Sequence, residues 1–250
     1  IKIMAEFKLP TEVIDLPSKG LLYPKDNPLS EGKIEIKYMT AKEEDILSNV
    51  SYIQKGIVLD KLFESLIVSK VNYDDLLIGD KNAVMIAARV LGYGNEYTFD
   101  YNGKQETVDL SQLDFVKVNE NDWTNGNNFS FQFPNSKTNI TFKLLNHGDE
   151  QKILKEVNSL KKLKKDSDST LSTRLKYMIT SVEGDDTTKT IRDFVDNYLL
   201  ARDSRALREY INTINPDIDL SFFPEDGESK RAIPIGLSLF WPDVNKLSWV

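Results

Sequence analysis

Few side chains in this sequence could carry out catalysis. The chain contains no cysteine and a single histidine, His147. These counts exclude disulfides, thiolate metal sites and cysteine nucleophiles, and a zinc site built from several imidazoles cannot form. His147 precedes Gly148-Asp149 at an expected junction between a strand and a helix, where an imidazole can satisfy an exposed backbone group. We interpret it as structural and predict no bound metal and no cofactor.

The acidic residues that could serve as catalytic groups are adjacent in the sequence. They are Asp74-Asp75, Glu43-Glu44-Asp45 and Asp185-Asp186. Paired carboxylate catalysis instead needs two acids on different elements, facing each other across a cleft. Helix caps and solvated faces explain these runs better. A cell-wall-directed hydrolase that uses acids such as Asp74 or Glu96 is kept as an alternative.

One run of basic residues could bind a polyanion. A helix over residues 152–165 would carry on one face Lys152, Lys155, Lys161, Lys162, Lys164 and Lys165. The run lacks interleaved aromatic or arginine side chains that could stack on bases, and the chain has a net charge of −7. We favour a solvated helix face, expect no nucleic-acid partner, and keep a nucleic-acid-binding module as the second alternative.

Two apolar segments favour docking over catalysis. Residues 1–32 are predicted to form an extended arm, because four prolines between residues 7 and 32 prevent a helix. The arm's apolar side chains must dock on their own domain or on a partner, and we favour a partner; they are Leu16, Leu21, Leu22 and Tyr23. The end of the chain concentrates large aromatics, including Phe240 and Trp241, which either close the core or form an interface.

The sequence pattern predicts an α+β fold of mixed helices and several antiparallel hairpins, and these elements must position the residues named above. Alternation and helical periodicity predict the following elements: strands at 33–39, 218–222 and 232–240; hairpins at 97–109 and 129–144; helices at 41–48, 58–68, 81–91, 149–164, 170–182, 188–201 and 203–213. Thr40 and Glu43 form a capping box, and Asn102-Gly103 is a strong hairpin signal.

Further expectations concern particular residues and regions. Caps are expected from Asp80, Asp149 and Asp203, and the polar loop around Trp123 is expected to be mobile. The chain divides into an extended N-terminal arm (1–32), an α+β region with two hairpins (33–146) and a helical region closing with a hairpin (147–250). Since no apolar run approaches 20 residues, we expect no membrane contact.

Several separate motifs together resemble one family. They are LPSKGLLYP, MTAKEEDIL, GDKNAVMIAARVLGYGNEY and the final FWP. In combination, from about Lys8 to Asp243, they resemble the baseplate hub protein family of contractile-tailed, T-even-type bacteriophages. The resemblance implies a non-enzymatic protein used in building the hub of the tail baseplate, either as a subunit or as an assembly factor. It would act in the host cytoplasm during assembly and, as a subunit, in the virion tail baseplate.

The resemblance also implies partners and docking surfaces. Its partners would be other baseplate hub proteins, with a homo-oligomer as a further candidate. The docking surfaces would be the arm from Leu16 to Pro24, the segment from Gly92 to Tyr97 and the terminus from Leu239 to Pro242. The partner-binding residues expected there are Leu16, Leu21, Leu22, Tyr23, Tyr93, Tyr97, Phe240 and Trp241. Arg89 is a candidate buried or interface charge.

One departure from the family bears on metals. Related phage proteins often carry cysteine pairs in the hairpin after the GYG segment and again before FWP, an arrangement that resembles a zinc ribbon. Neither hairpin of this chain contains a cysteine. We therefore expect zinc-ribbon-like hairpins without metal, held by apolar packing and by Asn-Gly and Asp-Gly turns.

Overall fold

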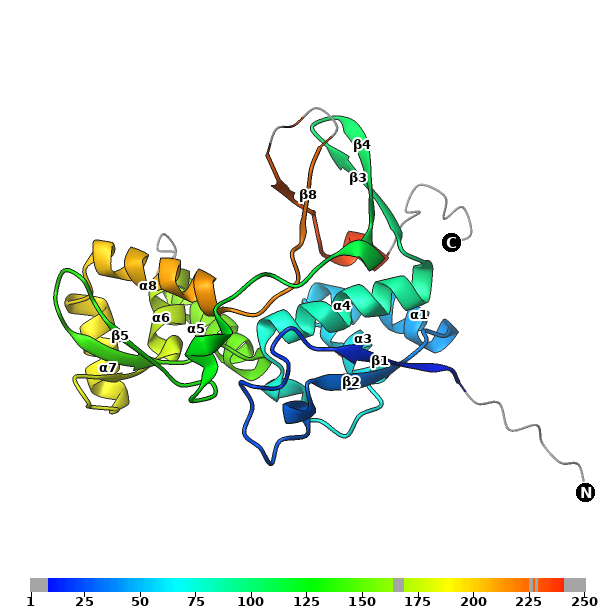
Figure 1. Cartoon of the computed structure of the whole chain (residues 1–250). Helices are drawn as coiled ribbons and strands as arrows, with labels where there is room; N and C mark the ends of the chain where they lie inside the picture. The colour runs from blue at the N-terminus through cyan, green and yellow to red at the C-terminus, as the bar shows by residue number, and fades with distance from the viewer. Residues whose placement is uncertain (1–8, 164–168, 225–226, 228, 241–250) are drawn as a thin grey trace, which may run out of the picture.

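Helices and short antiparallel sheets alternate along the chain in the computed structural model, which describes residues 9–163, 169–224, 227 and 229–240 (Figure 1). The helices in these ranges are α1 (Ala41–Leu47), α2 (Val50–Gln54), α3 (Val58–Leu66), α4 (Ile78–Tyr93), α5 (His147–Leu163), α6 (Thr170–Met178), α7 (Thr188–Asn197) and α8 (Ala201–Ile214). Short 3-10 turns are η1 (Pro28–Glu31), η2 (Tyr73–Asp75), η3 (Leu110–Gln112), η4 (Glu120–Trp123) and η5 (Leu237–Phe240).

Within the described ranges the sheets are small and antiparallel. The strands are β1 (Thr11–Asp15), β2 (Lys33–Lys37), β3 (Glu96–Tyr101), β4 (Lys104–Asp109), β5 (Phe129–Gln132), β6 (Asn139–Phe142), β7 (Ile179–Val182), β8 (Ser221–Phe222) and β9 (Arg231–Ala232). They pair as β1-β2, β3-β4, β5-β6-β7 and β8-β9. The predicted α+β class is confirmed.

The hairpin predicted around Asn102-Gly103 is confirmed. Tyr101 pairs with Lys104, so the turn has two residues, and both have positive φ, 51° and 80°. Such a turn matches the twist of the two strands it joins. The β3-β4 hairpin rises from the end of α4, and β8 lies against it, with the Phe99 and Phe222 rings 5.0 Å apart (Figure 1).

Helix α4 is the central helix of the N-terminal half, and half of its 16 residues are buried. It is longer than expected and begins at Ile78, where Gly79 makes a close backbone contact. A Cβ atom on Gly79 would lie 1.8 Å from the carbonyl oxygen of Pro216. Only glycine allows the segment after α8 to pass this close to the helix.

The capping expectations were right for one helix and wrong for three. Asp149 lies inside α5, and its N–H donates to the Asn146 side chain at 2.8 Å. The Thr40–Glu43 capping box is present, with the Thr40 N–H donating to the Glu43 carboxylate at 3.0 Å. Asp80 does not cap α4, whose N-cap is Leu77, and Asp203 does not cap α8. Both aspartates lie in the first turn of their helix but accept hydrogen bonds from distant segments, so tertiary contacts override the local cap.

The C-terminal half contains one strand that the sequence pattern did not reveal. Residues 179–182 were expected to continue a helix that begins at residue 170, but α6 ends at Met178. The next four residues form β7, which pairs with β6. These residues, Ile-Thr-Ser-Val, are mostly β-branched and pair well on a pleated surface, so the partner strand decides the structure.

The predicted mobile loop around Trp123 is instead anchored. Trp123 is buried at the end of η4, and its indole N–H donates to the Ile214 carbonyl at 2.9 Å.

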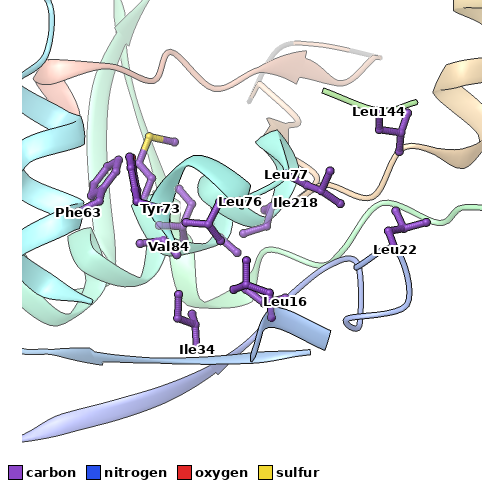
Figure 2. Packing of buried hydrophobic residues seen from close by; sticks show 14 of the residues in the cluster. Leu16, Leu22, Ile34, Phe63, Tyr73, Leu76, Leu77, Val84, Leu144 and Ile218 are labelled. Carbon is purple, nitrogen blue, oxygen red and sulfur yellow. The ribbon is translucent and has the colours of Figure 1, made fainter. Parts of the chain in front are cut away.

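One large cluster of buried apolar side chains, part of it shown in Figure 2, extends from Leu16 to Phe240. No helix in the described residues is both long and apolar enough to span a membrane.

Candidate functional site

The arm predicted to dock on a partner is folded into the protein's own core, which corrects that expectation. Its first part forms β1, paired with β2, and Leu16 and Leu22 are buried in the main apolar cluster (Figure 2). Tyr23 is buried in the same cluster. They are unavailable to a partner in this structure. Leu21 differs because its side chain is 52% exposed.

A buried carboxylate fixes this segment to α4. Asp80 accepts hydrogen bonds from the Ser18 N–H at 2.9 Å, the Ser18 hydroxyl at 2.7 Å and the Tyr23 hydroxyl at 2.6 Å. The Tyr23 oxygen also accepts from the Leu77 N–H at 2.9 Å. We call these four residues the Asp80 clamp. It joins LPSKGLLYP to GDKNAV, two motifs about 60 residues apart in sequence.

Burial sets the ionisation of the clamp. It raises the pKa of the Asp80 carboxyl above its usual value, although the hydrogen bonds from Tyr23 and Ser18 act in the opposite direction. Burial, together with the negative field of Asp80, also raises the pKa of the Tyr23 phenol. Tyr23 is therefore a phenol O–H donor to Asp80 at physiological pH, and the pair is one hydrogen-bonded unit.

Two more predicted partner-binding residues also lie inside the fold. Tyr97 is buried, and its hydroxyl donates to the Pro234 carbonyl at 2.9 Å. Phe240 is fully buried, with its ring 6.0 Å from that of Phe63. Both residues close the protein's own core, whereas Tyr93 is only half-buried and Trp241 lies outside the described residues.

Arg89, predicted to be a buried or an interface charge, is buried. Its guanidinium donates to the backbone carbonyls of Gly94 and Glu96, and it lies 5.7 Å from the centre of the Tyr93 ring. Burial lowers the pKa of this group. Arg89 therefore fixes the turn between α4 and β3, which explains how the GYG segment is held.

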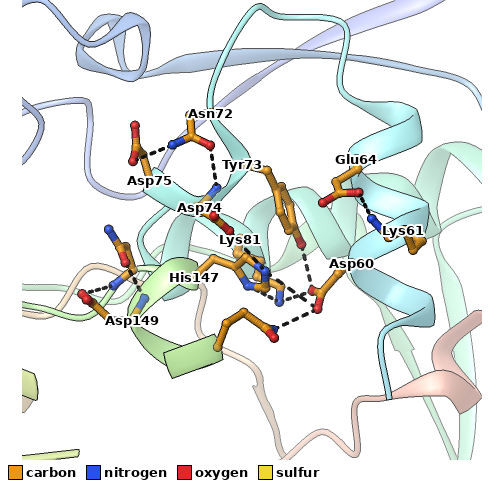
Figure 3. A network of polar contacts seen from close by, with 12 residues as sticks. Asp60, Lys61, Glu64, Asn72, Tyr73, Asp74, Asp75, Lys81, His147 and Asp149 are labelled. Atoms are coloured by element: carbon orange, nitrogen blue, oxygen red, sulfur yellow. Dashed lines mark hydrogen bonds and ion pairs between the residues drawn. The ribbon is translucent and has the colours of Figure 1, made fainter. Parts of the chain in front are cut away.

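The only histidine belongs to a polar cluster between α3, α4 and α5 (Figure 3). Lys81 donates to the Asp60 carboxylate at 2.6 Å and contacts Nδ1 of His147 at 3.1 Å. Asp60 also accepts from the Tyr73 hydroxyl at 3.1 Å and from the Gln151 amide at 3.2 Å. The His147 and Tyr73 rings are 4.5 Å apart. We call this group the His147 cluster.

The His147 cluster is poorly arranged for general-base catalysis. Burial, with the Lys81 charge second, lowers the pKa of His147. Because a lysine ammonium only donates, Nδ1 must be the acceptor and Nε2 carries the proton. The one lone pair that could take a proton is thus already engaged. Nε2 lies 3.8 Å from Asp60 and 3.9 Å from Asp74, too far for hydrogen bonds.

A cavity of about 610 Å³ opens beside the His147 cluster. Its walls include Asp60, Lys81 and His147, together with the ion pair between Glu150 and Arg174. Each carboxylate in this group has a basic partner within 2.6 Å, so the charges neutralise one another. Among the described residues, no group of three or more His, Asp or Glu side chains could hold a metal ion.

The acids and lysines of the alternative readings lie on the surface. Asp74 is exposed beside the His147 cluster, and Glu96 is exposed at the start of β3. Lys152, Lys155 and Lys161 are exposed along α5, while Lys164 and Lys165 lie outside the described residues. Ile153 and Val157 on the opposite face of α5 pack with Leu145 in a small second apolar cluster, whereas Leu154 is 51% exposed.

Sequence reasoning missed one exposed surface. Val13 is 60% exposed on β1, and a groove of about 300 Å³ lies between β1, α4 and the segment after β4. Thr11, Val13 and Ile14 are β-branched, which favours a strand, whereas the prolines on either side favour an extended arm. Comparison with family models, with curated proteins and with solved structures finds no match for the chain.

Proposed function

We propose that this protein is a non-enzymatic component used in building the hub of a phage tail baseplate, acting in the host cytoplasm by binding other hub proteins. The observation that supports this proposal best is the Asp80 clamp. Motifs that resembled a family separately, without touching one another, would be weak support. Here Ser18 and Tyr23 of one motif bind Asp80 of another. The motifs that carry the resemblance are therefore in contact with one another within one fold.

Other motifs of the resemblance contact the same core. The Arg89 guanidinium binds backbone within its own motif, GDKNAVMIAARVLGYGNEY, and Phe240 of the final FWP packs on Phe63 of α3. Glu43 of MTAKEEDIL accepts from Lys37 of β2 and from Ser65 of α3, both at 2.8 Å. These contacts indicate that the motif residues stabilise the fold. The partners are then bound by side chains other than these buried ones.

The His147 cluster supports a binding function over a catalytic one. A hydrolase needs an acid or base that is free to exchange a proton with a substrate. The imidazole lone pair here is engaged by Lys81, and Asp60 is engaged by three donors. This arrangement favours the interpretation that the cluster ties α3, α4 and α5 together.

The proposal is tested by affinity capture during infection. The tagged protein, produced in place of the native one, is captured from infected cells at successive times and its partners are identified by mass spectrometry. We expect the other hub proteins to be enriched over a control capture with an unrelated acidic protein of similar size. A tagged protein that supports infection but captures no hub protein contradicts the proposal. Comparing purified virions with lysate then separates a subunit from an assembly factor.

A further inference from the structure

His147 lies at the junction between the first turn of α5 and η2. Its N–H donates to the Leu76 carbonyl at 2.8 Å, and a Cβ atom on Gly148 would lie 3.2 Å from the Cβ atom of Asp74. The backbone of α5 therefore packs directly on η2. The His147 side chain belongs to the cluster that joins α5 to α3 and α4 (Figure 3). A charge gained by this imidazole would act on all of these contacts.

The contact between His147 and Lys81 requires an unprotonated Nδ1. The Lys81 ammonium, 3.1 Å away, can only donate, so Nδ1 must keep its lone pair. A proton on Nδ1 would place two cationic donors face to face. The helix adds to this effect, because His147 lies in the first turn of α5 and a helix N-terminus disfavours a cation. Burial acts in the same direction and lowers the pKa of His147.

The carboxylates near the imidazole oppose this effect only in part. Asp60 of α3 and Asp74 of η2 lie 3.8 and 3.9 Å from Nε2 and would attract an imidazolium. Asp60 already binds Lys81 at 2.6 Å, and the side chain of Asp74 is 66% exposed, so water screens its charge. Burial raises the pKa of the Tyr73 phenol, which stays neutral. The other carboxylates on α3 and in the first turn of α5 form ion pairs at 2.6 Å: Glu64–Lys61, Asp149–Lys143 and Glu150–Arg174.

We propose that His147 is an acid-sensitive switch: uptake of one proton at Nδ1 breaks its contact with Lys81 and loosens α5 from η2. The cavity of about 610 Å³, which His147 lines, gives protons a route to the ring. The pKa of the ring is lowered in the closed junction and returns toward its usual value of 6.5 when the junction opens. The junction is therefore most stable above pH 6.5 and weakens as the pH falls below it. This inference is independent of the proposed function.

The first test is an NMR titration of the Cε1–H signal, which is unambiguous because the chain has one histidine. We expect the midpoint to lie below 6.5 in the wild-type protein and to be higher in Lys81→Met, which removes the cation that faces Nδ1. Lys161→Met, at an exposed position further along α5, is the matched control and should leave the midpoint unchanged. A wild-type midpoint at or above 6.5, or one that Lys81→Met does not raise, overturns the inference.

The second test measures the loosening itself by hydrogen exchange. Between about pH 7.5 and about pH 5, protection of the η2 and first-turn α5 amides should fall by about threefold or more in the wild-type protein. His147→Asn keeps an acceptor for Lys81 but does not titrate, so its protection should stay nearly constant. Equal falls in both proteins, or no fall in the wild-type protein, contradict the switch. If His147→Asn fails to fold by circular dichroism, Lys81→Met takes its place, and a fall as large as in the wild-type protein contradicts the switch.

Discussion

Removal of one hydroxyl group should reveal how strongly the Asp80 clamp stabilises the fold. In Tyr23→Phe the ring stays in place, but Asp80 loses its 2.6 Å donor and the Leu77 N–H loses its 2.9 Å acceptor. A hydrogen bond to a charged group contributes about 1.5–3 kcal/mol, and an unsatisfied buried N–H costs about 1–3 kcal/mol. We expect the free energy of unfolding to fall by about 2.5–6 kcal/mol.

The measurement is urea denaturation followed by circular dichroism, with Tyr198→Phe as the matched control. Tyr198 is 64% exposed, so losing its hydroxyl should change the free energy of unfolding by less than about 0.5 kcal/mol. Asp80→Asn and the double variant complete a cycle, and we expect a coupling energy above about 1 kcal/mol between Tyr23 and Asp80. A loss below about 1 kcal/mol in Tyr23→Phe, or additive effects in the cycle, would refute the reasoning.

Three other substitutions test separate parts of the fold. Gly79→Ala should destabilise the protein severely, because its Cβ would meet the Pro216 backbone, whereas Gly92→Ala on the same helix meets only a flexible methionine and should be tolerated; equal melting temperatures would contradict this. Burial would raise the pKa of Glu43, but its hydrogen bonds hold that pKa at about 2, below the usual 4.5, so its contribution to stability is present above about pH 4.5 and is lost as the pH falls through about 2. The melting temperature of Glu43→Gln should therefore be well below that of wild type at pH 6, and a gap that does not shrink toward pH 2 would oppose the assignment. Ile86→Asp should give insoluble or unfolded protein, because it buries an unpaired carboxylate at a cost of several kcal/mol; soluble protein with unchanged melting would show that this face is not core.

Local signals predicted the elements well where the chain's nearest neighbours decide the structure. The Asn102-Gly103 hairpin, the Thr40–Glu43 capping box and the apolar character of α4 depend on residues within a few positions of one another. Turn conformation, capping and helical periodicity are short-range effects, and one sequence contains all the information they need.

Long-range contacts account for what the sequence did not reveal. Asp80 and Asp203 look like caps, yet Asp80 binds Ser18 and Asp203 accepts from Asn135 at 2.9 and 2.7 Å. Hydrogen bonds to these distant segments outweigh a local cap. The prolines of the N-terminal segment prevent a helix, as expected, but they do not prevent β1 from pairing with β2.

In the candidate site, too, the sequence revealed short-range features but not long-range contacts. Sequence reasoning identified Tyr23, Tyr97 and Phe240 as significant, but it could not distinguish an interface residue from a core residue, since both are large and aromatic. The backbone N–H and C=O groups of Val13 point away from β2. This direction depends on the register between the two strands, which only the structure provides. His147 was correctly expected at the start of a helix, whereas its contact with Lys81 was not foreseen.

The proposed role in building a phage baseplate hub through protein binding is tested most directly by deleting the coding sequence from the phage genome that this proposal implies and counting assembled particles by negative-stain electron microscopy. We expect filled heads to form while complete baseplates and tails fall at least a hundredfold, and wild-type protein supplied from a plasmid to restore them. Normal numbers of tailed, infectious particles from the deletion phage would contradict the account.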